Sequence, residues 1–320
     1  MDSTLVRSYI KQAALLFLSL AFAMFAFAWV RVWVVSLLDM GQFQTILEQF
    51  RDFEKFAPIS FDSLFTYQGR VGMTFDEPVI IICVVIWCIS RGSDVVSGEL
   101  GRGTMEMLLA QPIRRTTLLW SHAMVAVSGL ALLCLVVWGG IAVGVQLTTV
   151  KETQPKPVVQ VPIFGWEVPM QLGEPIKESF PLHERIDTFV YASATFNLFA
   201  FGFFLLGLSS LLSCRDRYRW RTIGLVMGIY VLQAVMFGLG KATESLQWLL
   251  NLTFFSCYKP QKLVSMINDG GFAAPWSLIT KMPDASLPPL AYPLLLIGLG
   301  LLFYGLAART FAKRDLPAPV

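Results

Sequence analysis

The stretch Ala13–Leu38, AALLFLSLAFAMFAFAWVRVWVVSLL, decides the fold class of this chain, and Arg31 is its only charged residue. A membrane helix needs about 20 mostly apolar residues to cross roughly 30 Å of hydrocarbon, and this stretch is long enough. The rest of the chain agrees, because 55% of its 320 residues are hydrophobic and only 15% are charged. Such a composition excludes a soluble enzyme, a nucleic-acid binder and a disordered protein.

Five further stretches qualify as membrane spans by the same criterion, so the sequence predicts an all-α polytopic membrane protein with six transmembrane helices. We expect one transmembrane domain over residues 1–320, with Pro78 in the first turn of its span and Asp76 or Glu77 as the cap. The predicted spans are 13–38, 78–97, 116–146, 189–212, 220–240 and 290–308, and the long outer loops are 39–76, 148–187 and 241–289.

Two alternatives to this arrangement of spans concern the first span and the stretch before the sixth span. Ala26-Phe27-Ala28 matches a signal-peptidase pattern, but the apolar run continues to Leu38, so we favour a retained first span over cleavage. Leu246–Tyr258 is apolar but too short to span, and Pro260 follows it, so we expect an interfacial or re-entrant element before span six. A seventh span there would move the C-terminus to the opposite side.

The charge distribution predicts the orientation. With both termini inside, the inner segments carry 13 basic and 6 acidic residues, whereas the longer outer segments carry 11 basic and 16 acidic ones. The run Cys214–Arg221, CRDRYRWR, is the clearest inner marker, with four arginines in eight residues. Because basic residues concentrate in cytoplasmic loops, we expect a multi-pass protein of the cytoplasmic (inner) membrane with cytoplasmic N- and C-termini.

The outer loops carry weaker signals. Phe43, Ile46, Leu47, Phe50 and Phe53 fall at helical spacing and predict an amphipathic helix. Residues 158–170 predict a short, edge-like hairpin around Gly165. The loops form either a simple extracytoplasmic cap or a gate for a substrate.

The segment Ser97–Arg115, SGELGRGTMEMLLAQPIRR, predicts a short cytoplasmic helix between spans two and three. Thr104 or Gly103 can cap its start, and Glu106 lies near the positive end of its dipole. An apolar stripe follows, and Pro112 ends the helix before two arginines. A capped amphipathic helix suits docking in a groove of a cytoplasmic partner, although it can also simply turn the chain round.

This segment resembles the E-x3-G-T-x-E-x-L-L-x-x-P-x-x-R signature of type-2 ABC-transporter permeases. The matching residues are Glu99, Gly103, Thr104, Glu106, Leu108, Leu109, Pro112 and Arg115. The resemblance implies that the segment is a coupling helix that inserts into a cytoplasmic ABC ATPase subunit. It also implies a dimer with a second copy or a related permease, a cytoplasmic amphipathic helix at Thr4–Gln12, and a re-entrant hairpin at Leu246–Ile267.

The chain has no G-x4-G-K-[ST] phosphate loop. We therefore expect that it is not an enzyme and that it binds no cofactor itself. ATP and Mg are expected on the partner ATPase. Membrane lipids are the other expected partners, and nucleic acid is not expected to bind.

The assigned span cores contain no Asp, Glu or Lys, which argues against a membrane enzyme or an ion-coupled transporter. The alternative to an ABC-transporter permease is a non-ABC membrane scaffold or an accessory subunit of a membrane complex. We expect His122 at the interface, and Asn197 and Gln233 in helix–helix hydrogen bonds.

Overall fold

The structure, a computed structural model, describes residues 3–37, 66–110, 114–153, 158–161, 166–169, 177–280, 282 and 286–314. Within these ranges, six helical stretches are long and apolar enough to cross a membrane, which confirms the predicted polytopic helical class. The candidate spans are Thr4–Leu37, Tyr67–Gly101, Arg115–Leu147, Thr188–Arg215, Arg219–Ala242 and Ala291–Lys313.

Long α-helices alternate with short helical segments and two pairs of strands. The α-helices are α1 (Ser3–Leu37), α4 (Tyr67–Gly72), α5 (Pro78–Ser93), α6 (Glu99–Gly101), α7 (Met105–Leu109), α8 (Arg115–Leu147), α9 (Ala192–Arg215), α10 (Arg219–Ala242), α11 (Pro260–Gly270) and α12 (Ala291–Lys313). The other elements are the 3-10 helices η2 (Met73–Asp76), η4 (Leu182–Glu184), η5 (Thr188–Tyr191), η6 (Glu244–Leu252), η7 (Phe254–Cys257) and η8 (Ala274–Trp276), the π-helix η3 (Asp94–Gly98), and the strands β1 (Thr149–Thr153), β2 (Val158–Val161), β3 (Trp166–Pro169) and β4 (Lys177–Pro181).

The first two spans differ from their predicted bounds. The helix expected at Thr4–Gln12 is not separate, because α1 runs unbroken from Ser3, with no Gly or Pro to interrupt it. The second span begins earlier, at α4, and η2 leads into Pro78. Pro78 is the first residue of α5 and Glu77 is its N-cap residue, as predicted.

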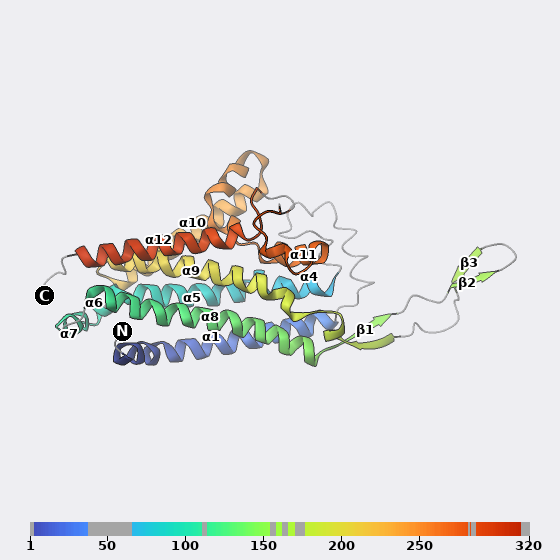
Figure 1. Cartoon of the computed structure of the whole chain (residues 1–320), viewed down its shortest axis with the longest axis horizontal. Coiled ribbons are helices and arrows are strands. Elements are labelled where there is room, and N and C mark those ends of the chain that lie inside the picture. The colour runs from blue at the N-terminus through green and yellow to red at the C-terminus, as the bar shows by residue number, and fades with distance from the viewer. Residues whose placement is uncertain are drawn as a thin grey trace.

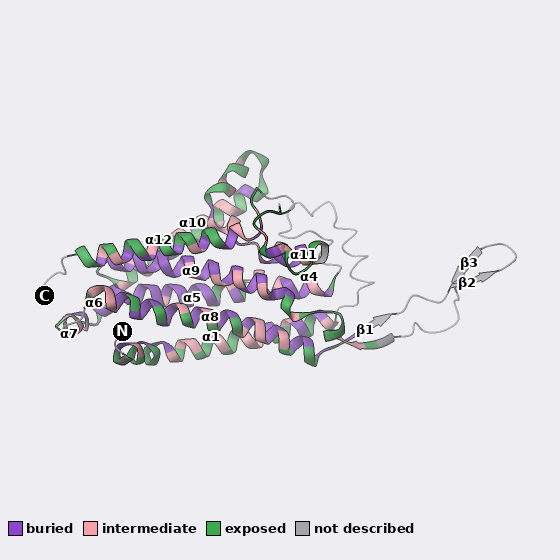
Figure 2. Ribbon diagram, viewed as in Figure 1, coloured by how far each residue is buried: buried purple, intermediate pink, exposed green. Residues whose placement is uncertain are grey.

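Helix α9 is the centre of the bundle. It packs against α5, α8, α10, α11 and α12, while α1 packs mainly against α8 (Figure 1). Of its 24 residues, 18 are buried, so α9 is purple along most of its length in Figure 2. The backbones of α9 and α12 approach closely where Gly207 faces Gly300, since a Cβ on Gly207 would lie 2.6 Å from the Gly300 carbonyl oxygen.

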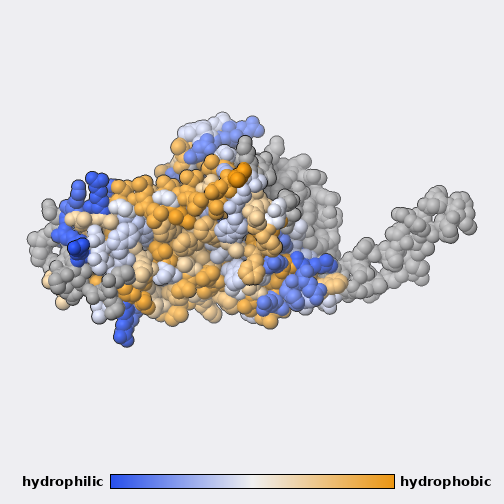
Figure 3. All heavy atoms as spheres, viewed as in Figure 1, coloured by the Kyte–Doolittle hydropathy of each residue, from blue (hydrophilic) through white to orange (hydrophobic). Residues whose placement is uncertain are grey.

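The sides of the bundle are apolar. Figure 3 shows a broad hydrophobic surface over the long helices, with hydrophilic groups at both ends. A water-soluble monomer rarely exposes such a continuous apolar surface, whereas lipid requires one. Large exposed side chains on the helices include Leu15, Phe22, Ile82, Leu132, Leu232 and Leu301.

The predicted hairpin forms within residues 158–169, where β2 pairs antiparallel with β3 from Val158↔Pro169 to Val161↔Trp166. Strands β1 and β4 pair antiparallel nearer the bundle. These two-stranded pairs are the sheet content of the described residues. The amphipathic helix predicted from Phe43 to Phe53 lies outside the described residues.

The segment predicted as an interfacial or re-entrant helix is formed by two short 3-10 helices. Residues 244–257 form the 3-10 helices η6 and η7, and α11 begins at Pro260. Asn197 and Gln233 hold this segment, which corrects their expected helix–helix role. The Asn197 side chain donates to the carbonyl of Cys257 (3.1 Å) and accepts from the amide of Lys259 (2.9 Å). The Gln233 side chain accepts from the amide of Phe254 (3.3 Å).

Helix α1 begins, and α12 ends, at the end of the bundle that carries α6 and α7 (Figure 1). We therefore predict the following labelling in a variant whose five native cysteines are replaced by alanine. An impermeant thiol reagent applied to intact cells should modify cysteine at exposed Glu184, but not at exposed Ser8 or Ala312. The reason is that Glu184 lies beyond α8, at the opposite end of the bundle. Labelling at Ala312 without cell lysis would contradict the six-span topology.

Candidate functional site

The predicted coupling segment begins with a tight turn built by Glu99, Gly103 and Thr104. The amide and hydroxyl of Thr104 both donate to the Glu99 carbonyl, at 3.1 and 3.2 Å, and the hydroxyl also contacts the Glu99 carboxylate. Gly103 has φ +71°, a left-handed conformation that favours glycine, and its amide donates to the Leu100 carbonyl. The structure thus brings these three predicted residues together, with the Thr104 hydroxyl bound to Glu99 directly before α7.

Helix α7 follows this turn and lies across the end of the bundle. The amide of Leu108 donates to the Thr104 carbonyl, so the first helical turn begins at Thr104. Met105 is buried, and Leu108 packs against a small cluster formed by Leu5, Tyr9 and Val125. Glu106 and Leu109 belong to α7, and Pro112 lies outside the described residues. Met107 is 73% exposed, so one apolar side chain of this short helix faces away from the protein.

Behind the turn lies an ion cluster centred on Asp94, whose side chain is only 4% exposed. Three guanidinium groups approach its carboxylate, from Arg91 at 3.4 Å, Arg102 at 2.7 Å and Arg219 at 3.5 Å. These arginines come from α5, from the turn after α6 and from α10. A buried carboxylate is stable only when it is paired and hydrogen-bonded, so Asp94 fixes the relative positions of these three segments.

Arg102 joins Asp94 to the predicted coupling residue Glu99. Its second guanidinium nitrogen donates to the Glu99 carboxylate at 2.8 Å. Burial alone lowers the pKa of Arg102, but the hydrogen bonds and charges of Asp94 and Glu99 outweigh it and raise that pKa above its ordinary value. Arg102 is therefore permanently charged, and it connects the turn of the coupling segment to the end of span two.

His122 belongs to the same cluster. We expected it at the membrane interface, but its side chain is buried in the bundle and only 2% exposed. Its Nε2 lies 3.0 Å from the guanidinium of Arg91, which can only donate, so Nε2 accepts and the proton resides on Nδ1. The ring also meets Tyr9 edge-on, with 5.0 Å between ring centroids. Span three and the start of α1 thereby contact the ion cluster as well.

The π-helix η3 carries Asp94 and is held by hydroxyl groups of neighbouring helices. The widened turn leaves the amides of Val96 and Ser97 to donate to the hydroxyl of Ser213 on α9, at 3.2 and 3.0 Å. The Ser97 hydroxyl donates to the Ser93 carbonyl and lies 3.2 Å from the Thr222 hydroxyl on α10. Such π-helical turns are rare and occur frequently at functional sites. The end of span two is thus fastened to α9 and α10.

The last predicted coupling residue, Arg115, starts α8 and reaches the end of α12. Its guanidinium donates to the carbonyl of Arg314 at 2.6 Å. The guanidinium of Arg314 in turn donates to the carbonyls of Cys214 and Asp216, at 2.8 and 3.1 Å. The two ends of the segment 99–115 are therefore anchored differently, one to α5 and α10 and the other to α9 and α12.

The sequence alone did not group five residues that form one cluster in the structure: Arg91, Asp94, Arg102, His122 and Arg219. A signal was present, because Arg91 and Asp94 stand three residues apart in an otherwise apolar stretch, which places them on one helix face. Their partners in α8 and α10 are distant in the sequence. Only the packing of the bundle brings them together.

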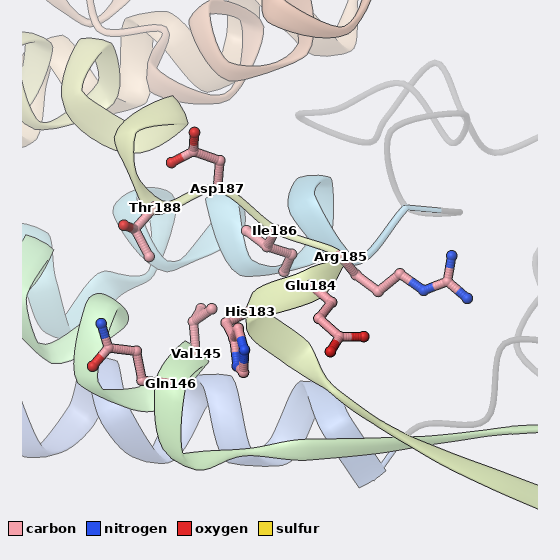
Figure 4. A pocket seen from close by; sticks show the side chains of 8 residues that line it. All are labelled: Val145, Gln146, His183, Glu184, Arg185, Ile186, Asp187 and Thr188. Atoms are coloured by element: carbon pink, nitrogen blue, oxygen red, sulfur yellow. The ribbon is translucent and has the colours of Figure 1, made fainter.

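A second candidate site lies at the opposite end, where a hollow of about 400 Å³ is lined by Val145, Gln146 and residues 183–188. Figure 4 shows that the Arg185 side chain extends away from His183 and Gln146. Across the described residues, no three His, Cys, Asp or Glu side chains come together to hold a metal ion. This hollow offers an open polar surface without a cluster of reactive groups.

A comparison with protein-family models decides the family. The model described as ABC-2 family transporter protein matches residues 6–316. The chain belongs to this family. A comparison with curated proteins gave no match. The ABC-2 match covers nearly the whole chain, including the segment 99–115 and the Asp94 cluster, and it identifies the chain as a membrane permease of an ABC transporter.

In this ABC-2 permease, we predict that Asp94→Asn removes the charge that compensates three guanidinium groups. Loss of one partner from a buried ion cluster should lower the free energy of unfolding by about 3–5 kcal/mol. Thermal unfolding of the detergent-solubilised protein, followed by tryptophan fluorescence, measures this change.

Glu77→Gln is the matched control, because it removes the charge of the Arg31–Glu77 pair (3.1 Å) at the other end of the bundle. That pair is partly exposed, at 18% and 31%, so its loss should have a much smaller effect. Equal losses of stability in the two variants would show that Asp94 has no special structural role.

Proposed function

We propose that this permease receives mechanical work from a separate cytoplasmic ABC ATPase through the segment 99–115, and uses it to export a cargo. The observation that carries the proposal is the connection of this segment's two ends to four spans. Arg102 binds both Glu99 and Asp94, and Arg219 of α10 also pairs with Asp94. Arg115 binds the end of α12. A displacement of α7 would therefore act on several helices at once.

The chemistry of the segment suits this transmission. Charge-assisted hydrogen bonds at 2.7 and 2.8 Å join Arg102 to Asp94 and Glu99, and such bonds are stronger and more directional than neutral ones. A connection of this kind resists deformation better than a glycine-rich linker. Met107, exposed on α7, offers an apolar side chain to a groove on the ATPase.

The partners follow from the same proposal. ATP and Mg bind to the ATPase, and a second copy of this chain or a related permease completes the translocation pathway. Helix α10 is suited to that contact, because only three of its 24 residues are buried. The coupling end, with both termini, lies in the cytoplasm, and the protein resides in the inner membrane. These assignments rest on the charge distribution and the family's architecture.

An ion-coupled transporter is less well supported, although Asp94 lies in the helical stretch of the second span. A proton or cation relay needs an acidic group that can exchange its counter-ion. Asp94 instead faces three arginines that cannot lose their charge, so it is a structural anion.

The proposal predicts that Gly103→Val uncouples the permease. A β-branched residue is strongly disfavoured at φ +71°, so the turn that positions α7 should reorganise. We expect loss of ATPase copurification from membranes and at least a tenfold fall in transport-coupled ATP hydrolysis, with normal insertion of the permease. Mass spectrometry identifies the copurified ATPase by a sequence that contains a phosphate-binding loop.

Gly101→Val is the matched control. A Cβ would meet open space at both Gly101 and Gly103, but Gly101 lies in α6 without a positive φ. The same side chain should therefore be tolerated at Gly101. Normal ATPase recruitment and hydrolysis in Gly103→Val would make the segment a simple connector and would favour a membrane scaffold.

A further inference from the structure

A second hollow, of about 460 Å³, lies at the end of the bundle where α9 and α12 finish. It is separate from the Asp94 cluster, and four of its six lining residues are basic. The lining residues are Cys214, Arg215, Arg309, Thr310, Lys313 and Arg314.

The positive charge of this hollow is not fully compensated within the described part of the chain. The ion pairs found there involve other arginines, and none includes a residue that lines the hollow. The nearby carboxylate of Asp216 accepts instead from the amides of Arg217 and Tyr218. The carboxyl ends of α9 and α12 contribute about −0.5 charge each and Asp216 one negative charge, so the four basic residues leave an excess of roughly two positive charges.

The surroundings place the hollow at the level of lipid headgroups. Tyr218 and Trp220, which follow the lining residues Cys214 and Arg215 in the chain, are 49% and 71% exposed, as aromatic residues are at a membrane surface. Arg217 and Arg221 lie over their rings, at 5.9 and 5.8 Å from the ring centroids. In Figure 3, hydrophilic groups at this end of the molecule border directly on the hydrophobic side of the bundle.

One face of α12 joins the basic hollow to the hydrocarbon. Leu302, Leu306, Arg309 and Lys313 follow one another at spacings of four, three and four residues, so they share a helix face. The two leucines are 55% and 37% exposed. A ligand with a negative head and apolar chains fits this arrangement, whereas a free phosphate would use only its basic end.

We propose that the hollow between the ends of α9 and α12 binds an anionic phospholipid, with its phosphate among Arg215, Arg309 and Lys313 and its acyl chains along Leu302 and Leu306. The lipid would belong to the leaflet on the coupling side of the membrane. Arg314 lines the hollow and accepts from Arg115 through its carbonyl, so bound lipid would contact the residue that anchors the end of the coupling segment.

Native mass spectrometry of the full-length permease in a mild detergent tests the proposal. Phosphatidylglycerol is titrated against phosphatidylcholine of the same chain length, and inorganic phosphate is a separate competitor. We compare wild type with the double variant Arg309→Gln/Lys313→Gln. Each basic residue near a membrane surface contributes roughly fivefold in affinity, so the variant should bind phosphatidylglycerol about 30-fold more weakly.

The charge-matched control is Arg7→Gln/Lys11→Gln, which removes two exposed basic residues of α1 away from the hollow. It should keep the preference for phosphatidylglycerol, and Arg309→Lys/Lys313→Arg should keep it as well. An equal loss of binding in the control would overturn the proposal in favour of diffuse surface charge. Equal binding of phosphatidylcholine by wild type, or displacement of the lipid by millimolar phosphate, would overturn it too. Because binding is measured without the ATPase, the result is independent of the proposed coupling role.

Discussion

The arrangement at the end of the bundle that carries α6 and α7 depends on the need to neutralise Asp94. A charged side chain in an apolar bundle is costly, and its cost falls only when partners surround it with good geometry. Asp94 lies in a π-helical turn, where Arg91, Arg102 and Arg219 reach it from three segments. The position of each segment is therefore constrained by a requirement of electrostatics, in addition to packing.

At the opposite end of the bundle, which also carries the Arg31–Glu77 pair, neutral hydrogen bonds hold the segment 244–259. There the side chains of Asn197 and Gln233 satisfy backbone groups of a segment that has no regular helix to satisfy them. Irregular backbone near a membrane is stable only when its polar groups find such partners. The two ends differ accordingly: a buried ion cluster fixes the end with α6 and α7, whereas amide side chains hold the 3-10 helices η6 and η7 at the other end.

The sequence was sufficient to predict the six spans, because each is a long apolar run whose meaning is local. It also predicted the first residue of α5, since proline has a local conformational effect, but it named Gly103 only as a possible helix cap and did not predict its left-handed turn. It failed for His122, Asn197 and Gln233, whose partners lie far away in the chain. Whether a polar residue faces lipid, another helix or a buried charge is a property of three-dimensional packing, and hydropathy carries no information about it.

The same limit explains why the basic residues look alike in the sequence but have two different environments. Arg102 and Arg219 compensate carboxylates, whereas Arg215, Arg309 and Lys313 line a hollow without any carboxylate from the described residues. The positive-inside rule predicts the cytoplasmic side for both groups, because it depends only on the sign of the charge. The rule does not explain why one group surrounds the buried Asp94 and the other lines a hollow at the surface. Arg102 and Arg219 pair with the buried Asp94. Arg215, Arg309 and Lys313 lie at the surface, where their charge is available to an anion from the membrane.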